Sequence, residues 1–323
     1  MTFTLGTFNV NNLFSRYNFD LQAEVPELKE GAVAIEKIKT IIEQAERKEI
    51  DYKGIGLHRK DPAERKTIAE RIKTMNLDVL CAQEIEDIDT LHYFVTHELN
   101  GFYPHVMLIE GNDPRLIDVA VMSKYPIGAA TTWQTASHPE APGERVFSRD
   151  MLQVEILNKA GTERLLTVFV NHLKSKFVPF MQNQTAGTKA ANSRRRLQAE
   201  TIAKIVHNVT RPDSAFAILG DMNDTPDADI LAPFAASPRL QLTNGLQSAE
   251  ETRPAPQSSS PPDSPVWTHR FKPSGKPAQY ELFDQIWLSK SLAAKQTGAF
   301  IERRTKMGGN GSDHDPAWVV LDI

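Results

Sequence analysis

The chain has 323 residues, 40% of them hydrophobic, with 37 basic and 41 acidic residues and a formal net charge of −4. This length and composition suit a soluble globular protein with a large buried core, and the balanced charge does not by itself indicate a nucleic-acid partner. No apolar run approaches the ~18 residues of a membrane span. The single cysteine, Cys81, excludes an internal disulfide, and the first residues lack the features of a signal peptide. We therefore expect a cytoplasmic protein, or a secreted one if a leader has been removed.

Short runs rich in β-branched and aromatic residues recur along the chain, and each run predicts a strand. In chain order they are Phe3–Val10, Val79–Gln83, His105–Ile109, Val119–Ser123, Met151–Leu157, Leu165–Asn171, Phe216–Leu219, Phe283–Leu288 and Trp318–Ile323. The predicted helices are Ala32–Lys48, a helix that begins at Pro62, and Ser193–Val209. Asp61, Pro62 and Glu64 form a helix-start signature. The run Arg194–Arg196 is interpreted as a solvated face of the last helix, with a phosphate-binding patch as the alternative.

This order of elements predicts the fold class. Many strands with few helices between them favour two mostly antiparallel sheets packed face to face with helices outside, over an alternating doubly wound parallel sheet. The expected fold class is therefore α/β in the broad sense, and α+β in the narrow one, because the sheets are mostly antiparallel. Residues 1–323 are interpreted as one domain. Two segments, near 15–60 and 247–265, are interpreted as insertions, and the second is a loop by its Ser/Pro content.

Polar side chains follow several of the predicted strands at the point where each strand ends. They are Asn9 and Asn11, Glu84, Asn171 and His172, and Asp221 and Asn223, while Asp313 and His314 lie in the segment that leads into the last strand. Asn9 and Asn11 are two residues apart, and so are Asp221 and Asn223. In an extended strand this spacing places both side chains of a pair on one face. Each group alone is ordinary turn chemistry. Together, carboxylates, amides and two histidines without a cysteine indicate Mg²⁺, Mn²⁺ or Ca²⁺ rather than zinc, and hydrolysis of a phosphate ester requires such groups.

Six segments, in order, resemble the motifs of the endonuclease/exonuclease/phosphatase superfamily. They are TFNVNNLF, LCAQEIED, VFVNHLKSK, ILGDMNDTP, LFDQIWLS and GSDHDPAW. That group includes DNases, apurinic-site endonucleases, bacterial sphingomyelinases and inositol-polyphosphate phosphatases. The resemblance runs from residue 3 to the C-terminus, apart from the two insertions. It implies a DNase-like four-layer α/β sandwich with the active site at one rim of the paired sheets.

The resemblance also implies a set of metal ligands. Glu84 would be the main metal carboxylate, with Asn9, Asn11 and Asp313 as ligands or water-mediated partners. Some members of the superfamily have aspartate at the position of Asn11, and the neutral amide here weakens the pull of that site on a cation. The expected cofactor is Mg²⁺, with Mn²⁺ or Ca²⁺ as alternatives.

Catalytic roles follow from the same resemblance. Asp221 would orient or deprotonate the attacking water, and Asn223 would donate from its amide to a phosphate oxygen. Asp284 would hydrogen-bond His314, which would contact the phosphate or act in proton transfer.

Further residues bear on substrate binding. The DNases and sphingomyelinases have a histidine at the position of His172, and the apurinic-site enzymes do not. In DNase-like members this histidine pairs with a carboxylate, and the resemblance assigns that role to Asp118. Arg149 resembles a phosphate-contacting arginine, and the alternative is a salt bridge with Asp150 or another acid. Lys174 either meets a phosphate or is solvated.

We therefore predict a divalent-metal-dependent phosphodiester hydrolase, and within that class a nuclease that cleaves DNA or RNA by in-line attack of water. The alternative is a phosphodiesterase or phosphatase for a small molecule or phospholipid headgroup, because this fold hosts all of them. A non-catalytic phosphate-binding module is a third hypothesis, and the joint presence of the groups that hydrolysis needs argues against it. Trp267 and Tyr280 either pack in the core or stack a base. No protein partner is inferred.

Overall fold

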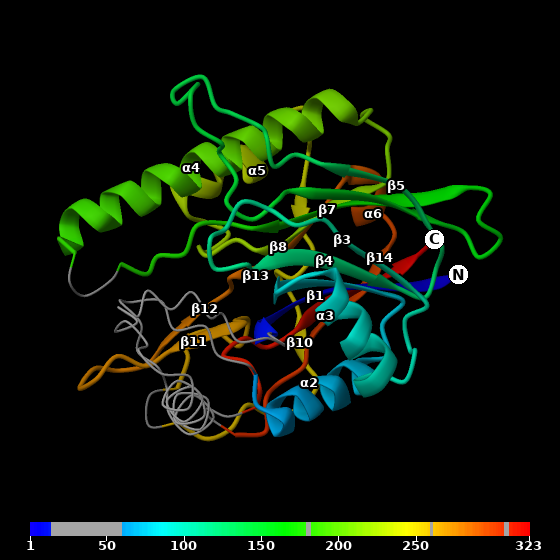
Figure 1. Cartoon of the computed structure of the whole chain (residues 1–323), viewed down its shortest axis with the longest axis horizontal. Coiled ribbons are helices and arrows are strands. Elements are labelled where there is room, and N and C mark those ends of the chain that lie inside the picture. The colour runs from blue at the N-terminus through cyan, green and yellow to red at the C-terminus, as the bar shows by residue number, and fades with distance from the viewer. Residues whose placement is uncertain (14–59, 179–181, 259–260, 307–309) are drawn as a thin grey trace, which may run out of the picture.

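Two β-sheets pack face to face in the computed structural model of the chain, with helices on both outer faces (Figure 1). The structure describes residues 1–13, 60–178, 182–258, 261–306 and 310–323. The helix expected over Ala32–Lys48 and nearly all of the first insertion lie outside these residues. Among the described helices, none combines the length and the apolar composition that a membrane span needs.

One sheet has seven strands in the order β10-β14-β15-β1-β2-β4-β3, and the other has six in the order β5-β6-β7-β8-β13-β9. The strands of the first are β1 (Thr2–Leu13), β2 (Val79–Ile85), β3 (His105–Leu108), β4 (Asp118–Ser123), β10 (Glu250–Glu251), β14 (Gln296–Ile301) and β15 (Ala317–Asp322). The strands of the second are β5 (Ile127–Thr132), β6 (Leu152–Leu157), β7 (Arg164–His172), β8 (Phe216–Asp221), β9 (Thr243–Asn244) and β13 (Asp284–Leu288). A separate hairpin, β11 (His269–Phe271) and β12 (Gln279–Glu281), extends beyond the left end of the sheets in Figure 1.

The helices form two outer layers (Figure 1). On the seven-stranded sheet lie α2 (Pro62–Met75), α3 (Ile88–Tyr93) and a π-helical turn (Phe94–Glu98), and on the six-stranded sheet lie α4 (Gln184–Val209) and α5 (Ala232–Ala235). The short helices η2 (Asp229–Leu231) and α6 (Lys290–Ala293) complete the described set. Asp61 caps α2, as its helix-start signature predicts. α4 begins earlier than predicted because Asn183 supplies its N-cap, accepting from the backbone N–H of Ala186.

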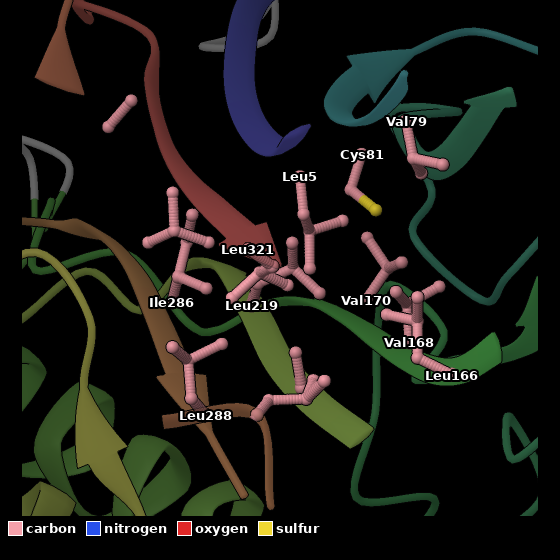
Figure 2. Packing of buried hydrophobic residues seen from close by; sticks show 14 of the residues in the cluster. Leu5, Val79, Cys81, Leu166, Val168, Val170, Leu219, Ile286, Leu288 and Leu321 are labelled. Atoms are coloured by element: carbon pink, nitrogen blue, oxygen red, sulfur yellow. The ribbon is translucent and has the colours of Figure 1, made fainter. Parts of the chain in front are cut away.

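Three apolar clusters separate the four layers. In the central cluster, Leu5 and Cys81 of one sheet pack with Val168, Leu219 and Ile286 of the other (Figure 2). A second cluster lies beneath α2 and α3, and a third lies beneath α4. Because burying one large aliphatic side chain contributes roughly 1.5–3 kcal/mol, the central cluster is the main source of stability between the sheets. Cys81 belongs to this core, as predicted.

This architecture confirms the predicted four-layer sandwich of mostly antiparallel sheets. Every predicted strand is present, whereas β5, β14 and the short strands β9, β10, β11 and β12 were not predicted. The four short strands have two or three residues each, too few for a periodic pattern. β5 and β14 lack a long apolar run, since β5 is an edge strand with only partly buried or exposed residues and β14 buries only Ala299 and Ile301. The second insertion is loop apart from β10, among its described residues.

A parallel pair of strands lies inside each sheet, β1 with β2 and β7 with β8. The carboxyl ends of parallel neighbours meet at the same edge of a sheet. Gly220 permits a close approach between β7 and β8: its φ is +132°, and a Cβ atom there would lie 1.9 Å from the carbonyl oxygen of Asn171. Only glycine tolerates this geometry. Each pair thus delivers the residues that follow it to one rim.

Candidate active site

The side chains that end the two parallel pairs meet at one rim of the sandwich. Asn9 Nδ2, from β1, donates to Asp221 Oδ2, from β8, at 3.0 Å and so joins the two sheets. His172 Nε2 lies 3.5 Å from the same oxygen, and His314 Nε2 lies 3.9 Å from it. Asp284 is directly opposite Asp221 in the register of β13 with β8. The structure therefore brings five of the predicted residues together around one buried carboxylate.

Glu84 ends β2 in a left-handed backbone conformation, with φ +66°. Such a conformation costs a non-glycine residue about 1–3 kcal/mol, and a surrounding network must hold it in place. Glu84 Oε2 accepts from the backbone N–H of Asn12 at 3.0 Å, and Oε1 lies 3.9 Å from His172 Nε2. Burial raises the pKa of Glu84, and the carboxylate of Asp313 raises it further. A divalent cation would relieve this concentration of negative charge.

Asp221 is buried and accepts hydrogen bonds on both carboxylate oxygens. Asn9 donates to Oδ2, and the backbone N–H of Asn223 donates to Oδ1 at 2.8 Å. Burial raises the pKa of Asp221 to about 6, against the opposing positive charge of His314. At neutral pH this carboxylate is ionised yet more basic than an ordinary aspartate, which suits a group that takes a proton from water.

His314 is held as a cation by its neighbours. Its Nδ1 donates to Asp284 Oδ2 at 2.6 Å, and its backbone N–H donates to Ser312 Oγ at 3.0 Å. Burial alone would lower the pKa of His314, but the carboxylates of Asp284 and Asp221 raise it to about 10. The backbone N–H of Asp284 donates to Thr268 Oγ1 at 2.9 Å, which fixes the start of β13. The arrangement predicted for Asp284 and His314 is therefore formed.

The pair predicted between His172 and Asp118 is not formed. His172 Nδ1 has no hydrogen-bond partner among the described residues, and its Nε2 faces Asp221 and Glu84. Asp118 instead accepts from the backbone N–H of Gly111 at 2.7 Å, because the turn before β4 supplies a nearer donor. Burial, and after it the charge of Arg149, lowers the pKa of His172 well below its usual value. His172 is therefore neutral at the site.

Arg149 forms the salt bridge that was the alternative to a phosphate contact. Its side chain is 2% exposed, pairs with Asp113 at 3.1 Å and donates to the carbonyl oxygen of Leu173. The partner is thus Asp113 and not Asp150. Asp113 and Leu173 therefore hold its terminal nitrogens.

Asn223 and Lys174, the other predicted phosphate contacts, retain donors. Asn223 Nδ2 donates to Leu173 O at 3.1 Å, which leaves its second amide hydrogen for a ligand. Lys174 is half-buried, and its Nζ donates to Ser175 O at 3.1 Å. Burial lowers the pKa of Lys174, and the charges of Arg149 and of Arg115 lower it further. A group of cations therefore lies on the His172 side of the rim.

Asn11 and Asp313 lie in looser positions than the other predicted metal ligands. Asn11 has φ +49°, so the extended alternation that would put its side chain on the face of Asn9 stops before it. Asn223 has φ +51°, and the same reasoning fails for the pair that it forms with Asp221. The Asp313 side chain is 54% exposed. The structure thus brings Asn9 inward and leaves Asn11 and Asp313 at the solvent side.

The oxygen donors of the rim fit a divalent cation. Glu84 is a half-buried carboxylate whose pKa is raised by burial and by Asp313, so the two acids share one electrostatic environment. His269, Asp313 and His314 also place potential ligand atoms within 4.8 Å of one another. His269 was not singled out in the sequence, because no motif surrounds it. His314 is already hydrogen-bonded to Asp284. The better ligands for a hard cation are therefore Glu84, Asp313 and Asn9.

Two further residues support the site without having been predicted. Ser312 Oγ donates to the carbonyl oxygen of Asn9 at 2.7 Å and accepts from His314, so it ties the last motif to β1. Its place inside GSDHDP is the one signal that could have marked it. Lys60 Nζ donates to the carbonyl oxygen of Asn11 from just before α2, and nothing in its local sequence indicates this contact.

Arg195 is not on a solvated face, contrary to the prediction for Arg194–Arg196. It is 1% exposed, pairs with Asp224 at 3.0 Å and donates to the carbonyl oxygen of Lys174 at 2.8 Å. α4 lies across the loops that follow β7 and β8, so this face of the helix is covered. Arg194 and Arg196 form ion pairs with glutamates at the surface.

Comparisons with known proteins agree with this geometry. No curated protein matches the chain. Solved structures match it at low identity: a family protein from Bacteroides thetaiotaomicron (TM-score 0.57, 12% identity, covering 100% of this chain and 99% of that one), the human nocturnin catalytic domain with bound sulfate (0.56, 15%, 99% and 94%) and an AP endonuclease from Archaeoglobus fulgidus (0.55, 14%, 99% and 100%). They share the fold. The profile described as the Endonuclease/Exonuclease/phosphatase family matches residues 6–314. The chain therefore belongs to this family, whose members are hydrolases acting on phosphate ester bonds.

Proposed function

We propose that this protein is a Mg²⁺-dependent phosphodiester hydrolase that cleaves nucleic acid. One observation carries the proposal: a buried carboxylate, Asp221, lies 3.9 Å from the imidazolium of His314, on the same rim as Glu84, whose side chain is 18% exposed. A base for water, a cation for phosphate oxygens and a carboxylate for a metal are the groups that hydrolysis of a phosphodiester requires.

The residues of the rim divide the chemistry between them. Asp221 accepts a proton from the attacking water, whose oxygen bonds to phosphorus as the bond to the leaving oxygen breaks. His314, oriented by Asp284, and the free amide hydrogen of Asn223 donate to the non-bridging phosphate oxygens. The neutral ring of His172 lies beside Asp221, where it accepts a hydrogen bond from the attacking water or donates one to it.

Glu84, Asn9 and Asp313 would hold the Mg²⁺. When bound, the ion supplies positive charge that neutralises the phosphate. These residues offer oxygen ligands only, which is the ligand class that Mg²⁺ prefers.

Nucleic acid is favoured as the substrate by positive charge beside the reacting groups. Arg115 is 43% exposed on its side chain, and its charge reaches both Lys174 and His172. A polynucleotide carries a phosphate on each side of the one that is cleaved, and such cations bind neighbouring phosphates.

The test is incubation of the purified protein with supercoiled plasmid, single-stranded RNA and a chromogenic phosphodiester, each with Mg²⁺, with Mn²⁺ and with chelator. Asp221→Asn and His314→Gln are measured beside the wild type, with His92→Gln, an exposed histidine of α3, as the matched control. We expect metal-dependent cleavage of nucleic acid that both site variants lose and the control retains.

Each part of the proposal can fail separately. Turnover in chelator would contradict the metal, and wild-type turnover by Asp221→Asn with an unchanged circular dichroism spectrum would contradict the assigned base. Turnover of the small diester with no action on either nucleic acid would contradict the substrate.

A further inference from the structure

The hairpin β11–β12 carries an exposed aromatic ring on the face that it turns to the active site. His269 and Phe271 are two residues apart in β11, so their side chains lie on one face of the hairpin. The His269 ring stacks on Phe283 and lies 4.8 Å from the ring of His314. Phe271 is 53% exposed. The face that covers the catalytic rim therefore continues outward as an unburied apolar ring.

This hairpin is attached to the loops of the site. Lys176 pairs with Glu281 at 2.7 Å and with Asp224 at 3.0 Å. Glu281 lies directly opposite His269 in the hairpin register, so the ion pair fixes the inner end of the same face. The residue after Lys176 is Phe177, which is 71% exposed. The loop that follows His172 therefore also carries an exposed phenyl ring.

Other aromatic residues of the hairpin region are already engaged. Trp267 is 1% exposed, and the guanidinium of Arg303 lies 3.9 Å over its ring. Tyr280 packs edge-on against Trp267 at 4.8 Å and donates to Ser258 Oγ. Trp267 is therefore buried, and the half-buried Tyr280 is held against it, so Phe271 is the more accessible ring of the hairpin.

We propose that Phe271 stacks an unpaired base of a single-stranded nucleic acid whose phosphate lies at the candidate catalytic rim. This inference rests on the proposed function and names its substrate class. A duplex keeps its bases stacked on each other, whereas a single strand offers free base faces to an aromatic side chain.

The hairpin turn favours a nucleic acid over a lipid surface. The membrane affinity of a surface segment scales with the apolar area that it buries. Here the turn between the strands reads KPSGKPA, with Lys272 and Lys276 and no large apolar residue. Phe271 lies behind this turn, on the side of His269, where two lysines can meet the phosphates that flank a stacked base.

The experiment measures the affinity of the full chain for a fluorescein-labelled single-stranded oligonucleotide in chelator, by anisotropy. We expect Phe271→Leu to weaken binding about 5- to 150-fold, the usual contribution of one stacked base, and Phe271→Tyr to retain wild-type affinity because the ring remains. Tyr93→Leu is the matched control, since Tyr93 is a similarly exposed ring (47%) on the outer helix α3. An oligonucleotide with abasic linkages should abolish the difference between wild type and Phe271→Leu.

Other results would overturn the inference. These are equal affinity of wild type and Phe271→Leu, or an equal loss on the base-containing and the abasic strand. Binding to phosphatidylserine vesicles that depends on Phe271, without an effect on the oligonucleotide, would assign the ring to a membrane instead. The assay needs no turnover, so base-dependent binding by an inactive wild type would contradict the proposed function alone, and turnover without a Phe271 effect would contradict this inference alone.

Discussion

Replacing Asp118 by asparagine should stabilise the protein at neutral and alkaline pH. Asp118 is 3% exposed, and its pKa is raised from 3.8 to about 7 by burial and by three nearby carboxylates, Glu110, Asp113 and Asp150. The folded protein binds this proton more tightly than the unfolded chain. The contribution of Asp118 to the free energy of unfolding is therefore fully present below pH 3.8 and is lost as the pH rises through 7. At 1.36 kcal/mol per pH unit, the loss is roughly 4 kcal/mol.

The measurement is urea unfolding in chelator at pH 5 and pH 8, followed by tryptophan fluorescence. Asparagine keeps an oxygen that can accept from Gly111, so the variant removes the charge and retains the hydrogen bond. We expect its stability relative to wild type to rise by about 2–3 kcal/mol between the two pH values. Asp213→Asn, at an exposed aspartate, is the control for the loss of one charge. An Asp118→Asn variant less stable than wild type at pH 8 would refute the reasoning, because a pair with His172 would stabilise the ionised form.

Three further predictions concern the rim itself. Glu84→Gln should weaken Mn²⁺ affinity by on the order of 100-fold or more, as measured by titration calorimetry, because the buried negative charge is lost; unchanged affinity would exclude Glu84 as a ligand. Ser312→Ala should cost about 1–3 kcal/mol in urea unfolding, since the carbonyl oxygen of Asn9 and one backbone N–H lose a buried partner; wild-type stability would show that water replaces the hydroxyl. Gly220→Ala should cost more than about 3 kcal/mol or prevent folding, because its Cβ overlaps the carbonyl of Asn171; a melting temperature equal to wild type would contradict the close approach.

The sequence predicts the strands well because most of them are buried and therefore carry uninterrupted apolar runs. It also marks part of the candidate site, since polar side chains beside the buried strands β1, β2, β7 and β8 are visible without a structure. Asn9, Glu84, His172 and Asp221 were marked in this way, and His314 lies in the segment before the last strand. Asp284 and the roles of all these residues came from the resemblance to the family. The distances between these residues cannot be predicted from the sequence in this way, because they depend on how the two sheets pack.

The predictions that failed involve contacts between elements far apart in the chain. Arg195 was expected in solvent because a run of arginines on a helix is usually solvated, and it is buried because α4 crosses the loop that carries Asp224. Asn11 was expected on the face of Asn9, and its left-handed backbone depends on neighbours that include Lys60. The resemblance paired Asp118 with His172, whereas Asp118 accepts instead from the backbone N–H of Gly111, in the turn before β4.

The hydrogen bond that joins the two sheets links Asn9 and Asp221, which are 212 positions apart in the chain, and Ser312 bonds to Asn9 across 303 positions. Closure of such long loops is completed late in folding, after most of the chain has condensed. No fragment of either sheet can retain the catalytic rim on its own, so activity and tertiary structure should disappear in one cooperative transition. A cation that binds only the assembled rim would stabilise the folded state of the whole sandwich. It would raise the free energy of unfolding by RT ln(1 + [M]/Kd). The proposed metal would in this way link the apparent stability of the protein to the concentration of that metal.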